Sequence, residues 1–310
     1  DVALRCNIVT VSTDDLPYEE KTIIDHSSSE ISTEDAAVLL EAVRKELETD
    51  IYKFYVGTSY RHLTIWDKGE VVELTPPHDV LGQVIGQYLP KTEALREMMK
   101  KSYDILSNHP INVERMKKGL NPANSIWFWG AGTRPVLAPF VEKTGHTGAM
   151  ISAVDLLKGI AVGADMKVVE VEGANGGLDT NYEGKADAAV EALLKDDLDF
   201  AYIHLEAPDE MGHQGSFERK VQAIENLDKR IIKRVTEQLE AAGTDFRMLV
   251  LPDHPTPVAI RTHVSDPVPY MLYDSTNKQS HTWNYNEKEA QESGNYIDKG
   301  YTIINHLFEK

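Results

Sequence analysis

The chain has 310 residues, of which 41% are hydrophobic and 26% are charged, and its formal net charge is −18. This composition is typical of a water-soluble globular protein, and the length predicts two domains, since one domain usually has roughly 100–200 residues. The acidic balance disfavours nucleic acid as a partner, because long-range attraction to phosphate is missing. It does not exclude a small anionic substrate, because bound metal ions can reverse the local field.

The chain has one cysteine, Cys6, so no intrachain disulfide can form and the cytoplasm is the expected location. No apolar run approaches the roughly 18 residues of a membrane span, and no basic start is followed by an apolar core. We therefore expect neither a membrane partner nor a signal peptide. The sequence leaves the oligomeric state open.

The first part of the chain is predicted to form a small α/β domain. The expected strands are 2–11, 52–56 and 62–66, and the expected helices are 27–47 and 91–109. Ser32 is the N-cap candidate of the first helix, with Asp35 in the position of a capping-box acid. The polar segment 113–125, which contains glycine and proline, breaks the second helix. We place the domain boundary there, between residues 1–121 and 122–310.

From residue 125 onward, predicted strands alternate with predicted helices. The strands are 125–130, 166–172, 199–207 and 245–253, and the helices are 154–164, 185–195, 217–242 and 297–310. Alternation of this kind predicts an α/β fold with a mostly parallel sheet between helices and right-handed crossovers. The run Trp127, Phe128 and Trp129 could stack on a ligand, but a buried strand explains it more simply.

Carboxylate and imidazole side chains adjoin three apolar runs in the last third of the chain. In order they are Asp209, His213, Asp253, His254 and His263. Ligands of open α/β sheets gather beyond the carboxyl ends of the strands, so we expect these side chains to converge. Taken singly, D-x-x-x-H and D-H pairs are common, and a D-H pair is more often a hydrogen-bonded turn. Oxygen and imidazole donors suit zinc, manganese or cobalt, and their number predicts most of a two-metal site.

The order of these motifs resembles the metal signature of the alkaline phosphatase superfamily. The sequence around these motifs is similar to that of cofactor-independent (2,3-bisphosphoglycerate-independent) phosphoglycerate mutases of the archaeal type. The matching blocks are EAPDEMGH (206–213), LPDH (251–254), THVSDPVP (262–269), EVEGANGGLDTNYEGKA (170–186) and DVALRCNIVTV (1–11). The resemblance implies an alkaline-phosphatase-like sheet sandwiched by helices, with residues 1–121 as a smaller inserted α/β domain that binds substrate and acts as a lid.

The same resemblance implies a site for two divalent metal ions. It assigns Asp209, His213 and His263 to one ion, and Asp253 and His254 to the other. Mn²⁺ is the first expectation, with Zn²⁺, Co²⁺ or Mg²⁺ as alternatives, and no 2,3-bisphosphoglycerate is required. The expected activity is interconversion of 3-phosphoglycerate and 2-phosphoglycerate, small phosphorylated sugar acids, through a phosphoserine intermediate.

The start of the chain differs from the family pattern. In the family, a segment with a metal-binding Asp and the nucleophilic Ser precedes the block matched by residues 1–11. We therefore expect a truncated chain, with the nucleophilic Ser outside it; the alternative is that the protein simply begins here. Other readings are a phosphatase or phosphotransferase of the same superfamily, such as a homoserine kinase-like enzyme, or an inactive fragment.

Five residues are candidates for substrate binding: Arg5, Arg61, His78, Asp79 and Lys185. The first four lie at strand ends or in loops. Arginine suits a bidentate grip on carboxylate or phosphate, and His78 could exchange a proton with a substrate hydroxyl. The alternative for each is a surface salt bridge or a capped turn. Lys185 opens a predicted helix, where a lysine is often merely solvated.

Overall fold

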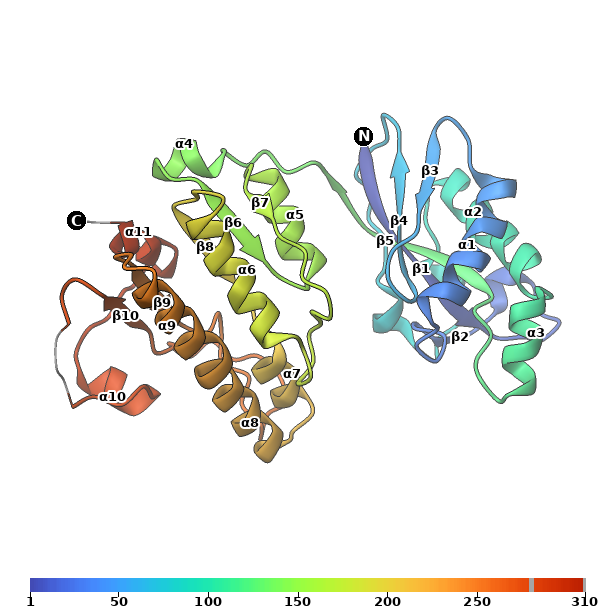
Figure 1. Cartoon of the computed structure of the whole chain (residues 1–310). Helices are drawn as coiled ribbons and strands as arrows, with labels where there is room; N and C mark the ends of the chain where they lie inside the picture. Colours follow the sequence, from blue (N-terminus) through green and yellow to red (C-terminus); the bar gives the residue numbers. More distant parts are fainter. Residues whose placement is uncertain (279–281, 309–310) are drawn as a thin grey trace. The chain divides into compact units, whose positions relative to one another are not determined.

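The computed structural model describes residues 1–278 and 282–308. The chain forms two compact units, Asp1–Pro135 and Val136–Lys310 (Figure 1). The observed division therefore lies at Pro135 and not after residue 121, because β5 (Ser125–Thr133) pairs with β1 (Val2–Val11) and joins the first unit. Among the described residues, no helix combines the length and apolar character that crossing a bilayer requires.

The sheet of the first unit is built around β1. β4 (Arg61–Trp66) and β5 both pair with β1, β3 (Tyr52–Tyr55) pairs with β4, and β2 (Ile23–Asp25) pairs with the end of β1. Each of these pairings is antiparallel. The strands predicted in this part of the chain are thus confirmed, with small shifts at their ends.

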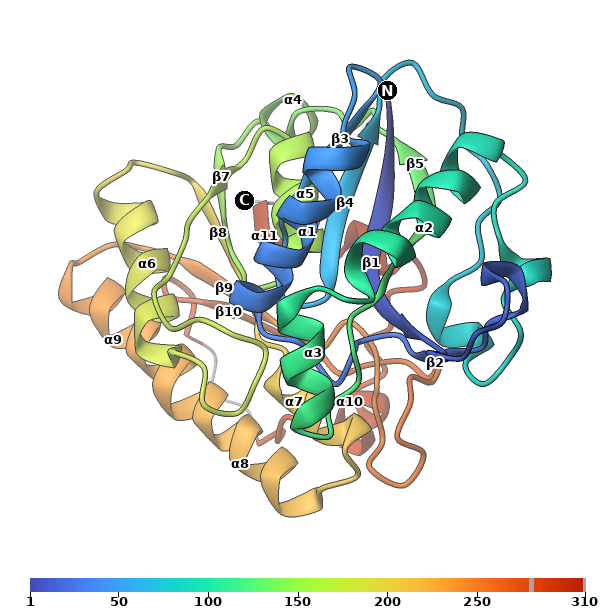
Figure 2. The ribbon, with the colours of Figure 1, turned by 90° about the vertical axis from the view of Figure 1, so that its right-hand side faces the viewer.

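Three helices lie on one face of this sheet: α1 (Thr33–Leu47), α2 (Glu93–Leu106) and α3 (Pro110–Lys117) (Figures 1 and 2). Ser32 caps α1 as predicted, since its hydroxyl accepts a hydrogen bond from the backbone nitrogen of Asp35 at 3.2 Å. α3 was not predicted, and the expectation that segment 113–125 only breaks a helix was wrong there. His109 and Pro110 start this helix: the His109 ring accepts a hydrogen bond from the nitrogen of Ile111.

Side chains along the first half of β1 alternate between the two faces of the sheet. Leu4 and Cys6 are buried in the core together with side chains of α1 and α2. Arg5 lies between them in sequence and is exposed. It stands opposite Leu63 of β4 and Trp129 of β5, so these three residues form a row on the face away from the helices.

The second unit contains parallel strands, as predicted. β6 (Gly148–Ile151) pairs in parallel with β7 (Lys167–Val168) and with β8 (Phe200–Ile203). β9 (Arg247–Val250) and β10 (Met271–Asp274) form a separate antiparallel pair. The strand predicted over 166–172 is shorter than expected.

Helices connect and cover these strands. α5 (Asp155–Gly163) and α6 (Tyr182–Leu194) follow β6 and β7, and α7 (Ala207–His213) follows β8. The predicted helix 217–242 is confirmed as α8 (Phe217–Leu227), a π-helical turn (Asp228–Ile232) and α9 (Lys233–Ala241), which runs beside α6 (Figure 1). The remaining elements are η1 (Tyr18–Glu20), η2 (Pro77–Val80), η3 (Gly86–Tyr88), α4 (Phe140–Thr144), α10 (Glu287–Glu292), η5 (Gly300–Thr302) and α11 (Ile303–Phe308). The predicted helix 297–310 is thus shorter at its start, and residues 309–310 lie outside the described residues.

Candidate metal site

Two of the predicted metal ligands lie one turn apart on α7. β8 ends at Ile203, and α7 begins at Ala207 with a proline in its first turn, where the missing N–H costs no helical hydrogen bond. Side chains four residues apart lie on the same side of a helix, so Asp209 and His213 point to one side of α7. The loop between β9 and β10 brings His263 to them.

The donor atoms of Asp209, His213 and His263 already have the mutual spacing of a coordination shell. Each histidine Nε2 is 3.3 Å from a carboxylate oxygen of Asp209, and the two Nε2 atoms are 3.1 Å apart. Four tetrahedral ligands about 2.05 Å from a metal ion would be about 3.3 Å from one another. The carboxylate and the two imidazoles therefore fit a single divalent ion. All three side chains are between 32% and 49% exposed, so an ion from solution can reach them.

A backbone hydrogen bond sets the tautomer of His213. Its Nδ1 lies 3.1 Å from the carbonyl oxygen of Arg261. A carbonyl oxygen only accepts, so Nδ1 donates to it. Nε2 is then the ring atom that faces Asp209 and His263. This is the arrangement in which an outer hydrogen bond orients a metal-binding histidine.

Asp253 and His254 adjoin this cluster as a second pair. His254 Nε2 is 3.2 Å from Oδ2 of Asp253, and the rings of His254 and His263 are 3.7 Å apart at an angle of 33°. Thr256 connects the two groups, because its hydroxyl donates to Oδ1 of Asp209 and lies 3.4 Å from Nδ1 of His254. All five predicted ligands thus meet in one region of the second unit.

The loop that carries Asp253 to His263 is fastened to α7 and α8. Lys220 of α8 donates to the carbonyl of Thr256 at 2.6 Å, and Arg261 donates to the carbonyl of His213 at 3.1 Å. Gly212 allows the close approach, because a Cβ there would lie 2.4 Å from the Thr256 carbonyl oxygen. Sequence reasoning missed Thr256, Lys220 and Arg261; only the nearness of Thr256 and Arg261 to the histidine motifs pointed to them.

Lys185 is buried in the same unit and is not solvated, contrary to the usual expectation for a lysine that opens a helix. Its side chain is 1% exposed, and Nζ donates to the carbonyl oxygens of His204 (3.2 Å) and Asn175 (3.4 Å). Burial lowers the pKa of Lys185, and the charge of Glu206 opposes that shift. His204 and Glu206 belong to the segment between β8 and α7, so the ammonium group lies beside the chain that leads to Asp209.

The other four predicted substrate residues lie in the first unit. Arg5 and His78 both contact the ring of Trp129, and His78 Nε2 is 3.7 Å from Oδ1 of Asp79. Arg61 lies over the ring of Tyr60, with its Cζ 5.2 Å from the ring centroid. Trp129 is only partly buried, so the expectation of a fully buried strand does not hold at this residue.

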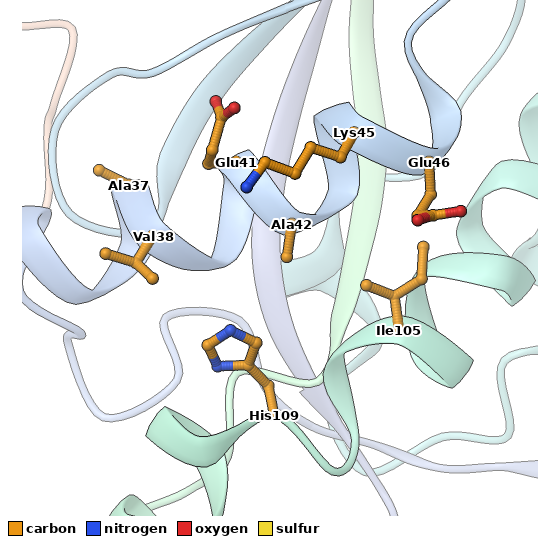
Figure 3. A pocket seen from close by; sticks show the side chains of 8 residues that line it. All are labelled: Ala37, Val38, Glu41, Ala42, Lys45, Glu46, Ile105 and His109. Carbon is orange, nitrogen blue, oxygen red and sulfur yellow. The ribbon is translucent and has the colours of Figure 1, made fainter.

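A hollow of about 500 Å³ on the first unit is lined by none of these residues. Its walls come from α1, α2 and the start of α3 (Figure 3): Ala37, Val38, Glu41, Ala42, Lys45, Glu46, Ile105 and His109. Most of this surface is aliphatic, and His109 is engaged as the cap of α3. The hollow therefore adds no chemistry to the candidate site.

In the second unit, α7 and the β9–β10 loop present a carboxylate and two imidazoles at ligand spacing. Such a group in an α/β unit is typical of a metalloenzyme. The family model described as Metalloenzyme superfamily matches residues 57–309. The chain belongs more narrowly to the 2,3-bisphosphoglycerate-independent phosphoglycerate mutases, whose model matches residues 1–112. The resemblance found in the sequence motifs is thereby confirmed.

Proteins with that name are similar over nearly the whole chain. The one from Methanosarcina barkeri is 46% identical over 299 residues, which is 95% of this chain and 73% of that protein. A probable one from Geobacter sulfurreducens is 42% identical and aligns with 100% of this chain and 77% of its own length.

Solved structures confirm the fold. A protein from Pyrococcus horikoshii superposes with a TM-score of 0.73 at 26% identity, over 94% of this chain and 68% of that one. The cofactor-independent phosphoglycerate mutase from Thermoplasma acidophilum gives a TM-score of 0.59 at 21% identity, over 99% and 76%. The predicted alkaline-phosphatase-like α/β class is thus supported by both sequence and structure.

Proposed function

We propose that this chain carries the metal-binding and substrate-binding parts of an enzyme that interconverts 3-phosphoglycerate and 2-phosphoglycerate. The observation that carries the proposal is the convergence of Asp209, His213 and His263, whose ligand atoms all lie within 4.8 Å of one another. The names of the relatives supply the substrate class. A cytoplasmic location, without nucleic acid or membrane as partner, belongs to the same proposal.

In this proposal Asp209, His213 and His263 hold one divalent ion, and Asp253 with His254 contributes to a second. Manganese is the first candidate for both ions, and 2,3-bisphosphoglycerate is not needed. When bound, a pair of divalent ions stabilises the charge on a phosphoryl group in transfer and favours ionisation of the attacking hydroxyl.

Other groups of this chain would orient the metal ligands and bind the phosphoryl group. The Arg261 carbonyl keeps the proton of His213 on Nδ1, and the Thr256 hydroxyl orients the carboxylate of Asp209. Lys185 would bind a phosphoryl oxygen through its ammonium group. Because this group is shielded from water, its attraction for an anion is stronger than that of an exposed lysine.

The first unit would hold the sugar-acid end of the substrate. Arg5 and Arg61 can each form two parallel hydrogen bonds to a carboxylate or phosphate, and His78 with Asp79 can exchange a proton with a hydroxyl. In this proposal the unit Asp1–Pro135 binds the substrate and has the lid role that the resemblance implies. The reaction would pass through a phosphoserine intermediate.

Metal binding tests the proposal on the 310-residue chain. We expect His213→Ala to weaken Mn²⁺ binding at least about tenfold in isothermal titration calorimetry, since it removes a direct ligand. His306→Ala, an exposed histidine of α11, is the control and should leave the affinity unchanged. Equal Mn²⁺ affinity in both variants would remove His213 from the site.

Activity is measured on this chain and on a longer form that matches the length of the relatives, since the chain aligns with 73% and 77% of their length. With Mn²⁺ and 3-phosphoglycerate, an enolase-coupled assay should detect 2-phosphoglycerate without added bisphosphoglycerate. Release of inorganic phosphate in place of 2-phosphoglycerate would favour a phosphatase and refute the mutase assignment.

A further inference from the structure

Trp129 in the first unit contacts two of the side chains proposed to bind substrate. The guanidinium carbon of Arg5 lies 4.5 Å from the Trp129 ring centroid. The rings of Trp129 and His78 are 5.2 Å apart at an angle of 81°. A cation is attracted to the face of an indole, and two rings prefer this edge-to-face arrangement. One aromatic side chain therefore orients both a guanidinium and an imidazole.

The pairing of β5 with β1 sets the position of Trp129, the last residue before a β-bulge. Along β1 and β5, Ala3 pairs with Gly132 but Arg5 pairs with Trp129, so β5 contains one extra residue between these pairs. Gly130 lies in this interval with a φ of +58°, a conformation that favours glycine, and a Cβ there would lie 3.3 Å from the Arg5 side chain. The regular pairing from Ser125 to Trp129 places the indole directly opposite Arg5, and the bulge follows this pair.

The indole itself is held by a buried amide. Nε1 of Trp129 donates to Oδ1 of Asn7 at 3.0 Å, and Asn7 is 2% exposed. On the side away from Trp129, the His78 ring faces the ring of His26, with the ring centroids 6.1 Å apart at an angle of 71°. His78 is thus held between Trp129 and His26.

The Arg5 guanidinium is held by stacking on the Trp129 ring and not by hydrogen bonds from its N–H groups. Among the described residues the Arg5 guanidinium makes no hydrogen bond and no ion pair, although the chain carries 50 acidic residues. Other arginines of the chain are paired with carboxylates: Arg44, Arg230, Arg234 and Arg247. A guanidinium fixed by stacking keeps its N–H edge available for a bidentate anion.

We propose that Trp129 is a positioning residue that holds Arg5 and His78 ready for the carboxylate of a phosphorylated sugar acid. The inference deepens the proposed function and rests on it for the identity of the ligand. Trp129 acts through its two neighbours, so its removal weakens anion binding and leaves the phosphoryl chemistry of the second unit unchanged.

Binding of 3-phosphoglycerate to the 310-residue chain, measured by isothermal titration calorimetry, tests the inference. Replacing the indole by Trp129→Leu should weaken binding about five- to tenfold, and Trp129→Phe, which keeps a weaker aromatic face, by less. Trp66→Leu is the matched control: Trp66 packs on Tyr52 at 5.7 Å in the same sheet. No guanidinium is found over Trp66 among the described residues. Trp66→Leu should leave the affinity unchanged.

Two results would overturn the inference. One is an unchanged affinity in Trp129→Leu. The other is equal weakening by Trp129→Leu and Trp66→Leu, because loss of a large ring would then act only through stability, which thermal denaturation of each variant monitors.

Kinetics separate this inference from the proposed function. In a mutase-active form, Trp129→Leu should raise KM for 3-phosphoglycerate by a similar factor and change kcat less than about twofold. Mutase activity with an unchanged KM would refute the role of Trp129 alone. If no form is active but binding of 3-phosphoglycerate still depends on Trp129, the mutase assignment fails and the anion site stands.

Discussion

The buried imidazole of His62 makes the stability of the first unit depend on pH. His62 lies on β4 opposite Cys6 of β1 and is 5% exposed. Its Nδ1 accepts a hydrogen bond from the backbone nitrogen of Gly57 at 3.1 Å, and its Nε2 has no partner among the described residues. Burial lowers the pKa of His62 to about 4, so the ring is neutral in the folded chain at neutral pH.

The sign and size of the effect follow from the two pKa values. In the unfolded chain the pKa of a histidine is about 6.5, so below that pH the unfolded state binds a proton that the folded state does not. The folded state therefore loses stability as the pH falls from about 6.5 toward 4. Each pH unit costs about 1.4 kcal/mol, so the full effect is about 3 kcal/mol.

The variant His62→Asn isolates this contribution. The Asn side-chain oxygen can take over the hydrogen bond from Gly57, and the side chain does not titrate. Urea denaturation followed by tryptophan fluorescence reports on the first unit, which contains Trp66, Trp127 and Trp129 of the four tryptophans. Between pH 7 and pH 4.5, we expect the wild-type chain to lose about 2–3 kcal/mol more than the variant. A difference between the two chains that stays constant over this range would refute the reasoning.

Two further predictions concern the second unit. In Gly212→Ala, the added Cβ would lie 2.4 Å from the Thr256 carbonyl oxygen, so it should push the loop away, cost about 1–3 kcal/mol in denaturant unfolding and weaken Mn²⁺ binding. Gly159→Ala, in a helical position with open space, is its control and should raise stability by about 0.5–1 kcal/mol. Lys185→Met should leave thermal stability equal or higher, because a desolvated cation is removed, yet weaken binding of 3-phosphoglycerate about tenfold in calorimetry. Unchanged binding would exclude Lys185 from the substrate site.

Local patterns in the sequence were enough to predict most of the helices and strands. The helical repeat after Ser32 predicted α1, and the alternation over 62–66 predicted β4, because each reflects one face packed against a core. α3 was missed because its first turn depends on a histidine cap and a proline. Neither belongs to the hydrophobic repeat that marked the other helices. α7 was missed because seven residues are too few to show a period.

Side-chain chemistry at strand ends predicted which residues meet in the second unit, but not how they are held. Asp209, His213 and His263 were found because their residue types are unusual in that order. Thr256 and Lys220 escaped notice because a threonine in a loop and a lysine on a long amphipathic helix are ordinary in sequence. Their importance comes from close approach, which exists only after α7, α8 and the β9–β10 loop have packed.

Trp129 was predicted to lie in a buried strand, but its side chain is only partly buried. From sequence, three bulky residues in a row indicate burial, and for Trp127 and Phe128 this is correct. Trp129 continues the regular pairing of Trp127 and Phe128 with β1, so strand alternation places its ring on the same face as Arg5, away from the helices. Three bulky residues in a row predict a buried strand, but they do not show how far each face of that strand is covered.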